Sequence, residues 1–376
     1  MDNMQTDNMQ TGNKKSNAIS LKKLIAAAWT RYSYIFVFII ILIMYAFTIS
    51  ANGNVFQWSH IVAILSSQNT VIVGTIALGM AMVIITGQID LSVGSSLVLV
   101  TGATVMVFNM TNSVVLMLLT ALAAGAICGF INGALVGFAK MPPFIVTLGT
   151  MLIYRSITLS LVRTIDPAIT GSGSSQFAML SSNSRYNFLR MGFGTGSLNI
   201  GVKLPYITFL FVALLIVMVI TAKGTKYGKS VYAVGSNDKA SHLAGINVQG
   251  VKVSVFVLTG VLVGFAGFVQ ACKIGNVTPA SSGKSYEMYA IASVVLGGIN
   301  MAGGRGNILG VFFGALSYTT INFIIVSIPS LSTDIQDTFQ GLVLIAVIFI
   351  QTVGPVINER LKKAMRKRRR QNAHSD

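Results

Sequence analysis

Charge is the scarcest property of this sequence. Only 10% of its 376 residues are charged and 53% are apolar, whereas an ordinary soluble domain carries about a quarter charged residues. So few charges cannot cover the surface of a water-soluble protein of this size. The mean hydropathy of +0.72 and long apolar runs such as 34–49 and 206–222 predict membrane-spanning helices, because about 20 apolar residues cross a bilayer core.

Reactive and metal-binding side chains are also rare. The two cysteines, Cys128 and Cys272, lie within apolar runs without a neighbouring His or Cys, so neither a disulfide framework nor a metal site is indicated. No HExxH or GxSxG motif occurs, and GTKYGKS (224–230) has three residues between its glycines where a phosphate-binding loop needs four. We therefore expect no enzyme activity, no catalytic residue and no cofactor in this chain.

The apolar runs and their breakers predict an all-α, polytopic membrane helix bundle with ten candidate spans. The spans are about 33–51, 61–86, 91–109, 113–139, 143–162, 205–222, 252–272, 287–300, 307–328 and 338–357. The third and the eighth are rich in Gly and Ser, so broken or re-entrant helices remain alternatives to full crossings there.

The placement of Lys and Arg predicts that both termini are cytoplasmic, because cytoplasmic loops carry the excess of these residues. With the N-terminus inside, the basic residues that fall outside are Arg163, Arg185, Arg190, Lys203, Lys273 and Lys284. Arg155 lies within a span, and the others fall inside. The expected divisions are a cytoplasmic tail (1–32), a transmembrane domain (33–357) with an external loop (163–204) and an internal loop (223–251), and a basic cytoplasmic tail (358–376).

The net charge of +17 also raises the alternative of nucleic-acid binding. The basic residues lie at the two ends and in a few loops, however, and the tail LKKAMRKRRR (361–370) is typical of a segment that lies against anionic lipid headgroups. We expect membrane lipid as a partner and no nucleic acid. The first 32 residues are polar and basic, and no small-residue cleavage site follows the first hydrophobic segment, so this segment is expected to be retained as an anchor.

The order of the spans suggests an internal symmetry. Spans two to five begin outside and spans seven to ten begin inside, so a similarity between the two groups would be an inverted repeat. Such repeats are typical of transporters, whose substrate path lies at the repeat interface near the membrane centre.

Two of only ten acidic residues stand at the starts of the Gly-rich spans, where an ionisable group is a functional candidate. Asp90, in GQIDLSVGSS (87–96), either caps a helix or contacts a substrate. Glu287 precedes a run of glycines that either permit close helix packing or break a helix beside a path.

Asn132 and Arg155 are polar within apolar spans. Asn132 is either interhelical glue or a ligand contact, and Arg155 either extends to an interface or pairs with an acid. The candidate residues for a translocation path are Asp90, Ser92, Gly94, Ser95, Asn132, Thr147, Glu287, Tyr289, Gly297 and Gly298.

Four segments together resemble the permeases of bacterial ABC importers for ribose, galactose, xylose and related monosaccharides, within a group that includes branched-chain amino acid permeases. The segments are GQIDLSVGS (87–95), MPPFIVTLGTM (141–151), KYGKSVYAVGSNDKASHLAGI (226–246) and YEMYAIASVVLGGINMAGGRG (286–306). The resemblance extends over roughly residues 35–357. It implies a permease homodimer in the bacterial inner membrane, two copies of a P-loop ATPase inside and an extracytoplasmic sugar-binding protein.

In that family a YAVGxNxxAAxxxGI loop docks on the ATPase, and the matching segment here is 232–246. We expect a short helix at 238–244 that transmits motion as a rigid knob, and the alternative is a solvated basic loop. The resemblance implies a coupling role for Tyr227, Gly228, Tyr232, Gly235, Asn237, Asp238, Ala240, Ser241 and Gly245. Two departures are Tyr289, where many members have Asp, and Ser241, where the family has the second of two alanines.

The sequence thus predicts the permease subunit of an ATP-driven monosaccharide importer that works by alternating access. One alternative is a secondary carrier driven by an ion gradient, with Asp90 or Glu287 as the coupling carboxylate. A membrane enzyme and an ABC permease for branched-chain amino acids are further alternatives.

Overall fold

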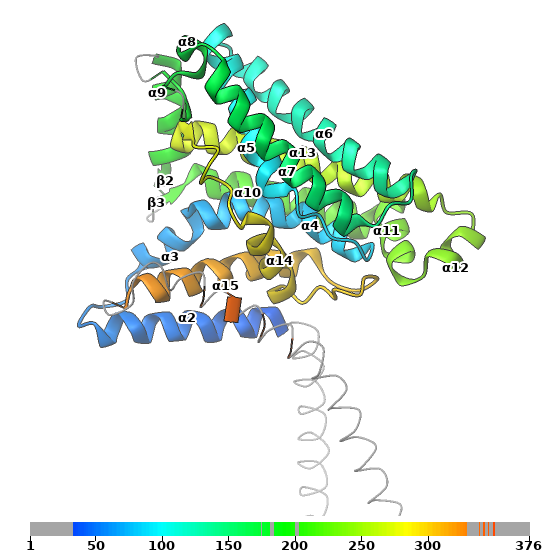
Figure 1. The fold of residues 1–376 in the computed structure, drawn as a ribbon. Helices are drawn as coiled ribbons and strands as arrows, with labels where there is room; N and C mark the ends of the chain where they lie inside the picture. Colours follow the sequence, from blue (N-terminus) through cyan, green and yellow to red (C-terminus); the bar gives the residue numbers. More distant parts are fainter. Residues whose placement is uncertain are drawn as a thin grey trace, which may run out of the picture.

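The computed structural model describes residues 33–173, 175–180, 184–199 and 203–328, together with isolated positions between 338 and 349. The described part is mainly helical. Figure 1 shows that its long helices extend between two ends of the molecule, one marked by α12 and the other by α8 and α9. We refer to these as the α12 end and the α9 end.

Seven of the described helices are long and apolar enough to cross a membrane. They are α2 (Ser33–Ala51), α5 (Val93–Thr111), α6 (Val114–Gly137), α7 (Pro143–Thr164), α10 (Tyr206–Gly224), α13 (Val248–Ile274) and α15 (Ile308–Val326). A further apolar pair is bent by 48° where α3 (Trp58–Ser66) meets the π-helical turn η1 (Asn69–Val73) and α4 (Gly74–Ile85), and it is an eighth crossing if the pair forms one span and not a re-entrant loop. The polytopic helix bundle expected from the sequence is therefore confirmed.

The two Gly-rich spans differ from each other. The third is a full helix, α5, although the chain enters it through the non-helical stretch 86–92. The eighth is the short helix α14 (Tyr286–Leu296), whose 11 residues are about 16 Å long at 1.5 Å per residue. This is about half of a bilayer core. Only isolated positions of the predicted tenth span are described, and both predicted tails lie outside the described residues.

Short elements occupy both ends of the bundle. At the α9 end, α8 (Pro167–Thr170), α9 (Ser184–Arg190) and the π-helical turn η2 (Met191–Thr195) accompany two antiparallel strand pairs. The pairs are β1 (Phe177–Ala178) with β4 (Asn276–Val277), and β2 (Ser197–Asn199) with β3 (Lys203–Pro205). At the α12 end lie α11 (Lys226–Ser236) and α12 (Asp238–Leu243).

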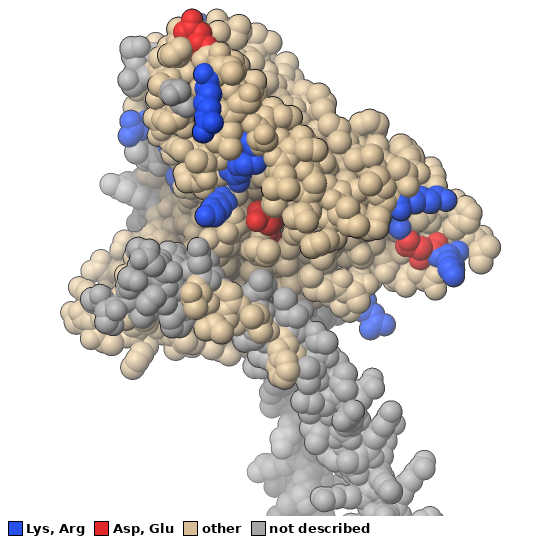
Figure 2. All heavy atoms as spheres, in the orientation of Figure 1, with Lys and Arg blue, Asp and Glu red and all other residues tan. Residues whose placement is uncertain are grey.

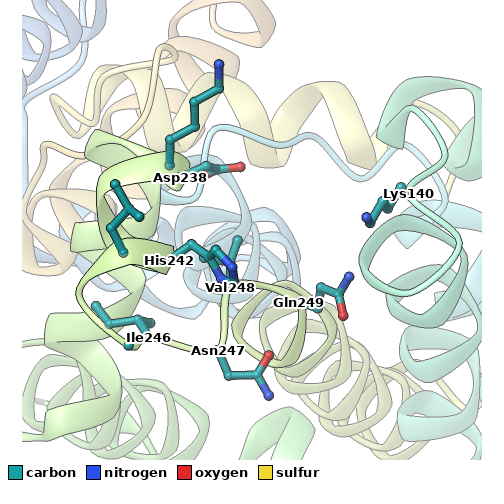
Figure 3. A pocket seen from close by; sticks show the side chains of 10 residues that line it. Lys140, Asp238, His242, Ile246, Asn247, Val248 and Gln249 are labelled. Carbon is teal, nitrogen blue, oxygen red and sulfur yellow. The ribbon is translucent and has the colours of Figure 1, made fainter.

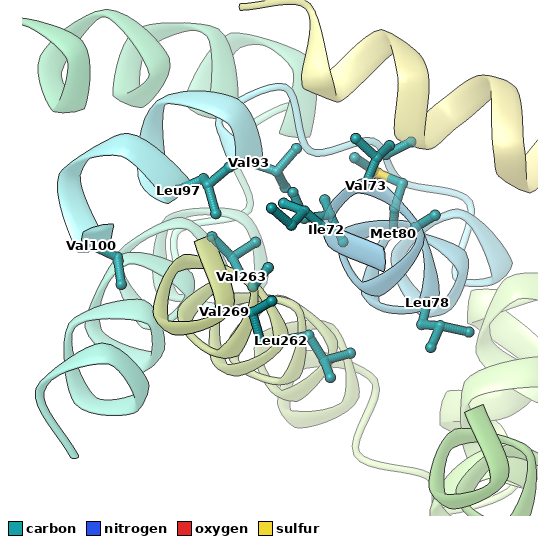
Figure 4. Packing of buried hydrophobic residues seen from close by; sticks show 14 of the residues in the cluster. Ile72, Val73, Leu78, Met80, Val93, Leu97, Val100, Leu262, Val263 and Val269 are labelled. Carbon is teal, nitrogen blue, oxygen red and sulfur yellow. The ribbon is translucent and has the colours of Figure 1, made fainter. Parts of the chain in front are cut away.

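The helix α4 is the centre of the core. Every residue from Gly74 to Ile85 is buried, as expected of a helix that is apolar on all sides and enclosed by other helices. Figure 4 shows Ile72, in the turn η1 that leads into α4, facing side chains of α5 and α13. The packing of these helices fixes where α5 begins, and thereby the position of the GQIDLSVGSS segment.

The helices α6 and α13 approach each other closely because glycines face backbone. A Cβ atom on Gly125 would lie 2.2 Å from the Gly260 carbonyl oxygen, and one on Gly260 would lie 2.2 Å from the Gly125 oxygen. Gly129 and Gly264 make similar contacts. Small residues four apart are the usual means of packing membrane helices, so this pair forms a rigid unit.

The face drawn in Figure 2 shows a broad surface over α6 and α7 that carries few charged side chains; these gather toward its two ends, and a few also lie near the middle of the view. Large apolar side chains are exposed on these helices, including Leu119, Phe130, Phe144 and Leu152. Such a surface is unfavourable in water and is typical of a helix face against lipid.

Candidate functional site

Polar side chains cap the three helices that begin at the α12 end. The Thr225 hydroxyl accepts a hydrogen bond from Gly228 N at 3.0 Å, the Asn237 amide oxygen accepts one from Ala240 N at 2.9 Å, and the Asn247 amide oxygen accepts one from Gly250 N at 2.9 Å. These residues begin α11, α12 and α13. Polar side chains at helix N-termini satisfy backbone donors that have no partner within the helix. The predicted short helix in the coupling segment is confirmed.

The position of α12 is fixed by an ion pair and by its buried side. The Lys252 ammonium on α13 lies 2.5 Å from Asp238 Oδ2, and Ser241 is buried. Leu243 at the C-terminal end of α12, in contrast, is 88% exposed. Gly245 follows with φ +81°, a conformation that glycine adopts without strain, and turns the chain toward α13. An apolar side chain is thus presented at the tip of a fixed knob.

A cavity of about 790 Å³ lies beside this knob. Figure 3 shows Lys140 reaching it from the α6–α7 connection, opposite Asp238 and His242. The lining residues are Lys140, Asp238, Lys239, His242, Leu243, Gly245, Ile246, Asn247, Val248 and Gln249. Because Asp238 is paired with Lys252, the charge of the lining is positive. A second cavity of about 730 Å³ shares Lys140, Asp238, Val248 and Gln249 and extends to Gly87, Gln88 and Gly235.

The last turn of α11 is wedged between two distant parts of the chain. A Cβ atom on Gly235 would lie 1.7 Å from the Ile85 carbonyl oxygen and 2.7 Å from Gly304 N. Gly304 N itself donates to the Ile85 oxygen at 2.8 Å. Only glycine fits at position 235. We call this contact of α11 with the end of α4 and with the turn after α14 the Gly235 junction.

Two tyrosines of α11 strengthen this arrangement. The Tyr232 hydroxyl donates to the Gly306 carbonyl oxygen at 3.0 Å, and the Tyr227 hydroxyl lies 3.2 Å from the hydroxyl of Ser254 on α13. Burial raises the pKa of both tyrosines above its usual value, so both remain neutral at physiological pH. At the start of α11, a Cβ atom on Gly228 would lie 2.2 Å from the Ala222 oxygen, so this glycine permits the sharp turn from α10.

Asp90 lies in the turn in front of α5, where its carboxylate binds Ser92, the residue before the first helical one. Its Oδ1 atom accepts hydrogen bonds from Ser92 N at 2.9 Å and from the Ser92 hydroxyl at 2.7 Å. The Asn132 amide on α6 donates to the same hydroxyl at 2.8 Å. All three side chains are buried. They join α5 to α6.

A second group forms where α5 meets the chain in front of α14. A Cβ atom on Gly94 would lie 2.3 Å from the Gly283 carbonyl oxygen and 2.7 Å from Glu287 Oε2, and one on Gly283 would lie 2.5 Å from the Gly94 oxygen. We call this contact the α5–α14 junction. Glu287 is half-buried there, and the N-terminal ends of α5 and α14 approach each other at this contact.

The other predicted path residues do not join these two groups. Ser95 is buried on α5, and the Thr147 hydroxyl donates within α7 to the Pro143 oxygen at 2.9 Å. The Tyr289 ring lies 5.1 Å from the Tyr318 ring, between centroids. Gly297 packs against Gly310 of α15, with a Cβ atom only 2.6 Å from the Gly310 carbonyl carbon.

Gly298 follows at the end of α14, is exposed and has φ +79°. The Gly-rich segment therefore serves both close packing and a turn.

Sequence reasoning missed Lys140, Leu243 and Gly283 as members of these sites. Lys140 has φ +56°, which is uncommon for a residue with a side chain, and nothing in the sequence marks it. Leu243 could have been noticed as an apolar residue within a polar loop. Gly283 lies in the polar segment TPASSGKS, whose contacts depend on the fold.

Comparisons with known proteins agree on one family. The model of the permease component of the branched-chain amino acid transport system matches residues 60–348. The ribose import permease of Bacillus subtilis (strain 168) is 35% identical over 277 residues, which are 74% of this chain and 80% of that protein.

The fructose import permease of Rhizobium meliloti is 32% identical over 308 residues, 81% of this chain and 80% of that protein. The galactose/methyl galactoside import permease of Haemophilus influenzae is 34% identical over 265 residues, 66% of this chain and 74% of that protein. No solved structure matches the chain.

Proposed function

The chain belongs to the permease family of the branched-chain amino acid transport system, and on this premise we propose that it is the membrane subunit of an ATP-driven importer of a monosaccharide. It is a transport protein rather than an enzyme. The printed names of its relatives specify ribose, fructose and galactose, which supports a sugar over an amino acid as the substrate.

We assign the α12 end to the cytoplasm of a bacterial inner membrane. Lys140, Lys239 and Lys252 lie at or near this end, in accord with the excess of basic residues in cytoplasmic loops. The α9 end then faces outward, and an extracytoplasmic sugar-binding protein docks there. Both termini are cytoplasmic.

The observation that carries the proposal is the knob at the α12 end. A P-loop ATPase, present in two copies, receives α12 and covers Leu243, whose side chain has almost no contact within this chain. The ion pair of Asp238 with Lys252 and the capped helix starts keep the knob rigid, so a movement imposed on it is transmitted and not absorbed. The positive cavity beside it accepts acidic side chains of the ATPase.

The Gly235 junction is the route from the knob to the path. The Ile85 carbonyl is two residues before Gly87, the start of the GQIDLSVGSS segment, and Gly304 ends the Gly-rich segment that follows α14. A displacement of α11 must therefore move the chain in front of α5 and the chain behind α14 together, because atoms at contact distance cannot pass each other.

The path itself runs beside the α5–α14 junction, and a second copy of the chain completes it. The two hydrogen bonds from Ser92 account for the Asp90 carboxylate without a coupled ion, which favours an ATP-driven subunit over a secondary carrier. A neutral sugar needs hydroxyl, amide and aromatic contacts more than fixed charge, and affinity resides mainly in the binding protein. The path opens to one side at a time as the ATPase pair closes and opens.

Uptake into proteoliposomes tests this proposal. The purified permease is reconstituted with the ATPase and the binding protein with which it is isolated, and uptake of radiolabelled ribose, fructose, galactose and leucine is measured. We expect ATP-dependent uptake of one of the sugars that is insensitive to a proton or sodium ionophore. Leucine uptake, or sugar uptake that needs no ATP and collapses with the ionophore, would refute the proposal.

A further inference from the structure

An arginine in the middle of a membrane helix holds the segment in front of α14. Arg155 is the thirteenth residue of α7, and its Nη1 atom donates to the Pro279 carbonyl oxygen at 2.7 Å and to the Ser282 carbonyl oxygen at 2.6 Å. It neither extends to an interface nor forms a direct ion pair with an acid among the described residues. An arginine within a span is costly unless it has a function.

The segment that Arg155 holds, residues 278–285, is a run of turns directly in front of the short α14. It enters from the α9 end, where β4 pairs with β1. Its own hydrogen bonds are those of turns. Ser281 N and Ser282 N donate to the Thr278 oxygen at 3.1 and 2.8 Å, Lys284 N donates to the Ser281 oxygen at 3.4 Å, and Thr278 N donates to the Ser282 hydroxyl at 3.0 Å. Non-helical backbone at membrane depth persists only where protein or a water-filled path surrounds it.

The same segment closes the α5–α14 junction. Gly283 touches Gly94, as described above, and leaves no room for a side chain on either residue. The Arg155 guanidinium also attracts the Glu287 carboxylate without touching it. The Arg155 side chain on α7 thereby binds a segment that contacts α5 and leads directly into α14.

We propose that Arg155 latches the 278–285 segment over the α5–α14 junction, and that release of this latch opens the path toward the α9 end. The inference rests on the proposed function, since it assumes that the path passes this junction. Arg155 is a positioning residue. Its two acceptors are backbone carbonyls, so the latch does not depend on the identity of the side chains at 279 and 282. After release, the electrostatic attraction between the Arg155 guanidinium and the Glu287 carboxylate favours the return of the guanidinium to the two carbonyls.

Thiol accessibility tests the latch without any substrate. Ser281 is exposed within the segment, whereas Cys128 and Cys272 are 5% and 0% exposed, so Ser281→Cys supplies the only accessible thiol among the described residues. The full complex in proteoliposomes is treated from outside with a membrane-impermeant maleimide. The rate is measured with Arg155 intact, with Arg155→Met, with Arg155→Lys and with Arg163→Met, a matched change at an exposed arginine of the same helix.

We expect Arg155→Met to raise the rate several-fold, Arg155→Lys to give an intermediate rate and Arg163→Met to change nothing. With Arg155 intact the rate differs between nucleotide-free and ATP-analogue-bound complexes, and in Arg155→Met this difference disappears, which a merely structural bond would not cause. Equal rates in Arg155→Met and Arg163→Met, or an unchanged nucleotide dependence, would overturn the latch. If Arg155→Met does not fold, the same comparison is made with Arg155→Lys.

Failure of the latch and failure of the proposed function are distinguishable. A wild-type complex that transports no sugar contradicts the function, while the thiol rates still decide whether Arg155 holds the segment.

Discussion

The close contact of α6 with α13 predicts that replacing a glycine by alanine lowers the stability at this contact, whereas the same replacement at an open position of another helix does not. In Gly260→Ala, the new methyl group meets the Gly125 carbonyl oxygen at 2.2 Å. This acceptor is helix backbone and cannot rotate away, so the two helices must part by roughly 1 Å, which also loosens the neighbouring contacts. Overpacking of this kind costs about 1–3 kcal/mol. We expect Gly260→Ala to lower the free energy of unfolding by about this amount.

Gly149→Ala is the matched control. Gly149 also lies within a membrane helix, α7, but apart from the backbone of its own helix no atom of the described residues comes within 4 Å of the position that its Cβ atom would occupy. Without a clash, only the helix propensity changes, and Ala is favoured over Gly by up to about 1 kcal/mol.

Thermal unfolding of both purified variants in one detergent, followed by size-exclusion chromatography of the soluble fraction, compares them directly. Gly260→Ala should have a Tm below that of the wild type and Gly149→Ala a Tm at or above it. The reasoning is refuted if the two variants shift the Tm in the same direction by the same amount.

Three further predictions address the sites. Asp90→Asn keeps an oxygen that accepts from Ser92, so this variant should retain ATP-driven uptake. Asp90→Ala leaves the buried donors of Ser92 unpaired, which lowers the stability by about 1–3 kcal/mol. A folded Asp90→Asn complex without uptake would instead favour a coupling carboxylate. Gly94→Ala should abolish uptake in a folded complex, because its methyl group meets the Gly283 oxygen at 2.3 Å; normal uptake would show that the α5–α14 junction is not part of the path. Leu243→Asp should reduce the amount of ATPase that co-purifies with the permease. Leu198→Asp, a matched change at an exposed leucine of the α9 end, should reduce it less. Equal amounts of ATPase in the two variants would place the ATPase elsewhere.

The sequence predicted the long helices well because their apolar runs are not ambiguous. The bounds expected for the first span, 33–51, are those of α2, and the coupling helix was expected one residue longer than α12 is. The bend between α3 and α4 was not predicted, since it depends on packing against other helices and not on a proline or a glycine at the bend.

The sites were predicted only in part, because the sequence does not determine which polar residues meet. Asp90 and Asn132 were both singled out, but only the fold shows that they share the Ser92 hydroxyl. Arg155 was expected to extend to an interface or to pair with an acid, and it bonds to backbone carbonyls, which no sequence pattern identifies. Gly235 was assigned to coupling by resemblance alone, and its contact with Ile85 and Gly304 supplies a physical reason.

The central claim is that this permease is driven by a separate ATPase that docks on α12. The most direct measurement is to purify the tagged chain in mild detergent from its native cell and to identify what accompanies it by mass spectrometry, alongside a variant that lacks residues 234–245. The account predicts that a P-loop ATPase accompanies the intact chain and is absent from the deleted one. An intact, folded chain that carries no ATPase and still transports sugar under an ion gradient would contradict it.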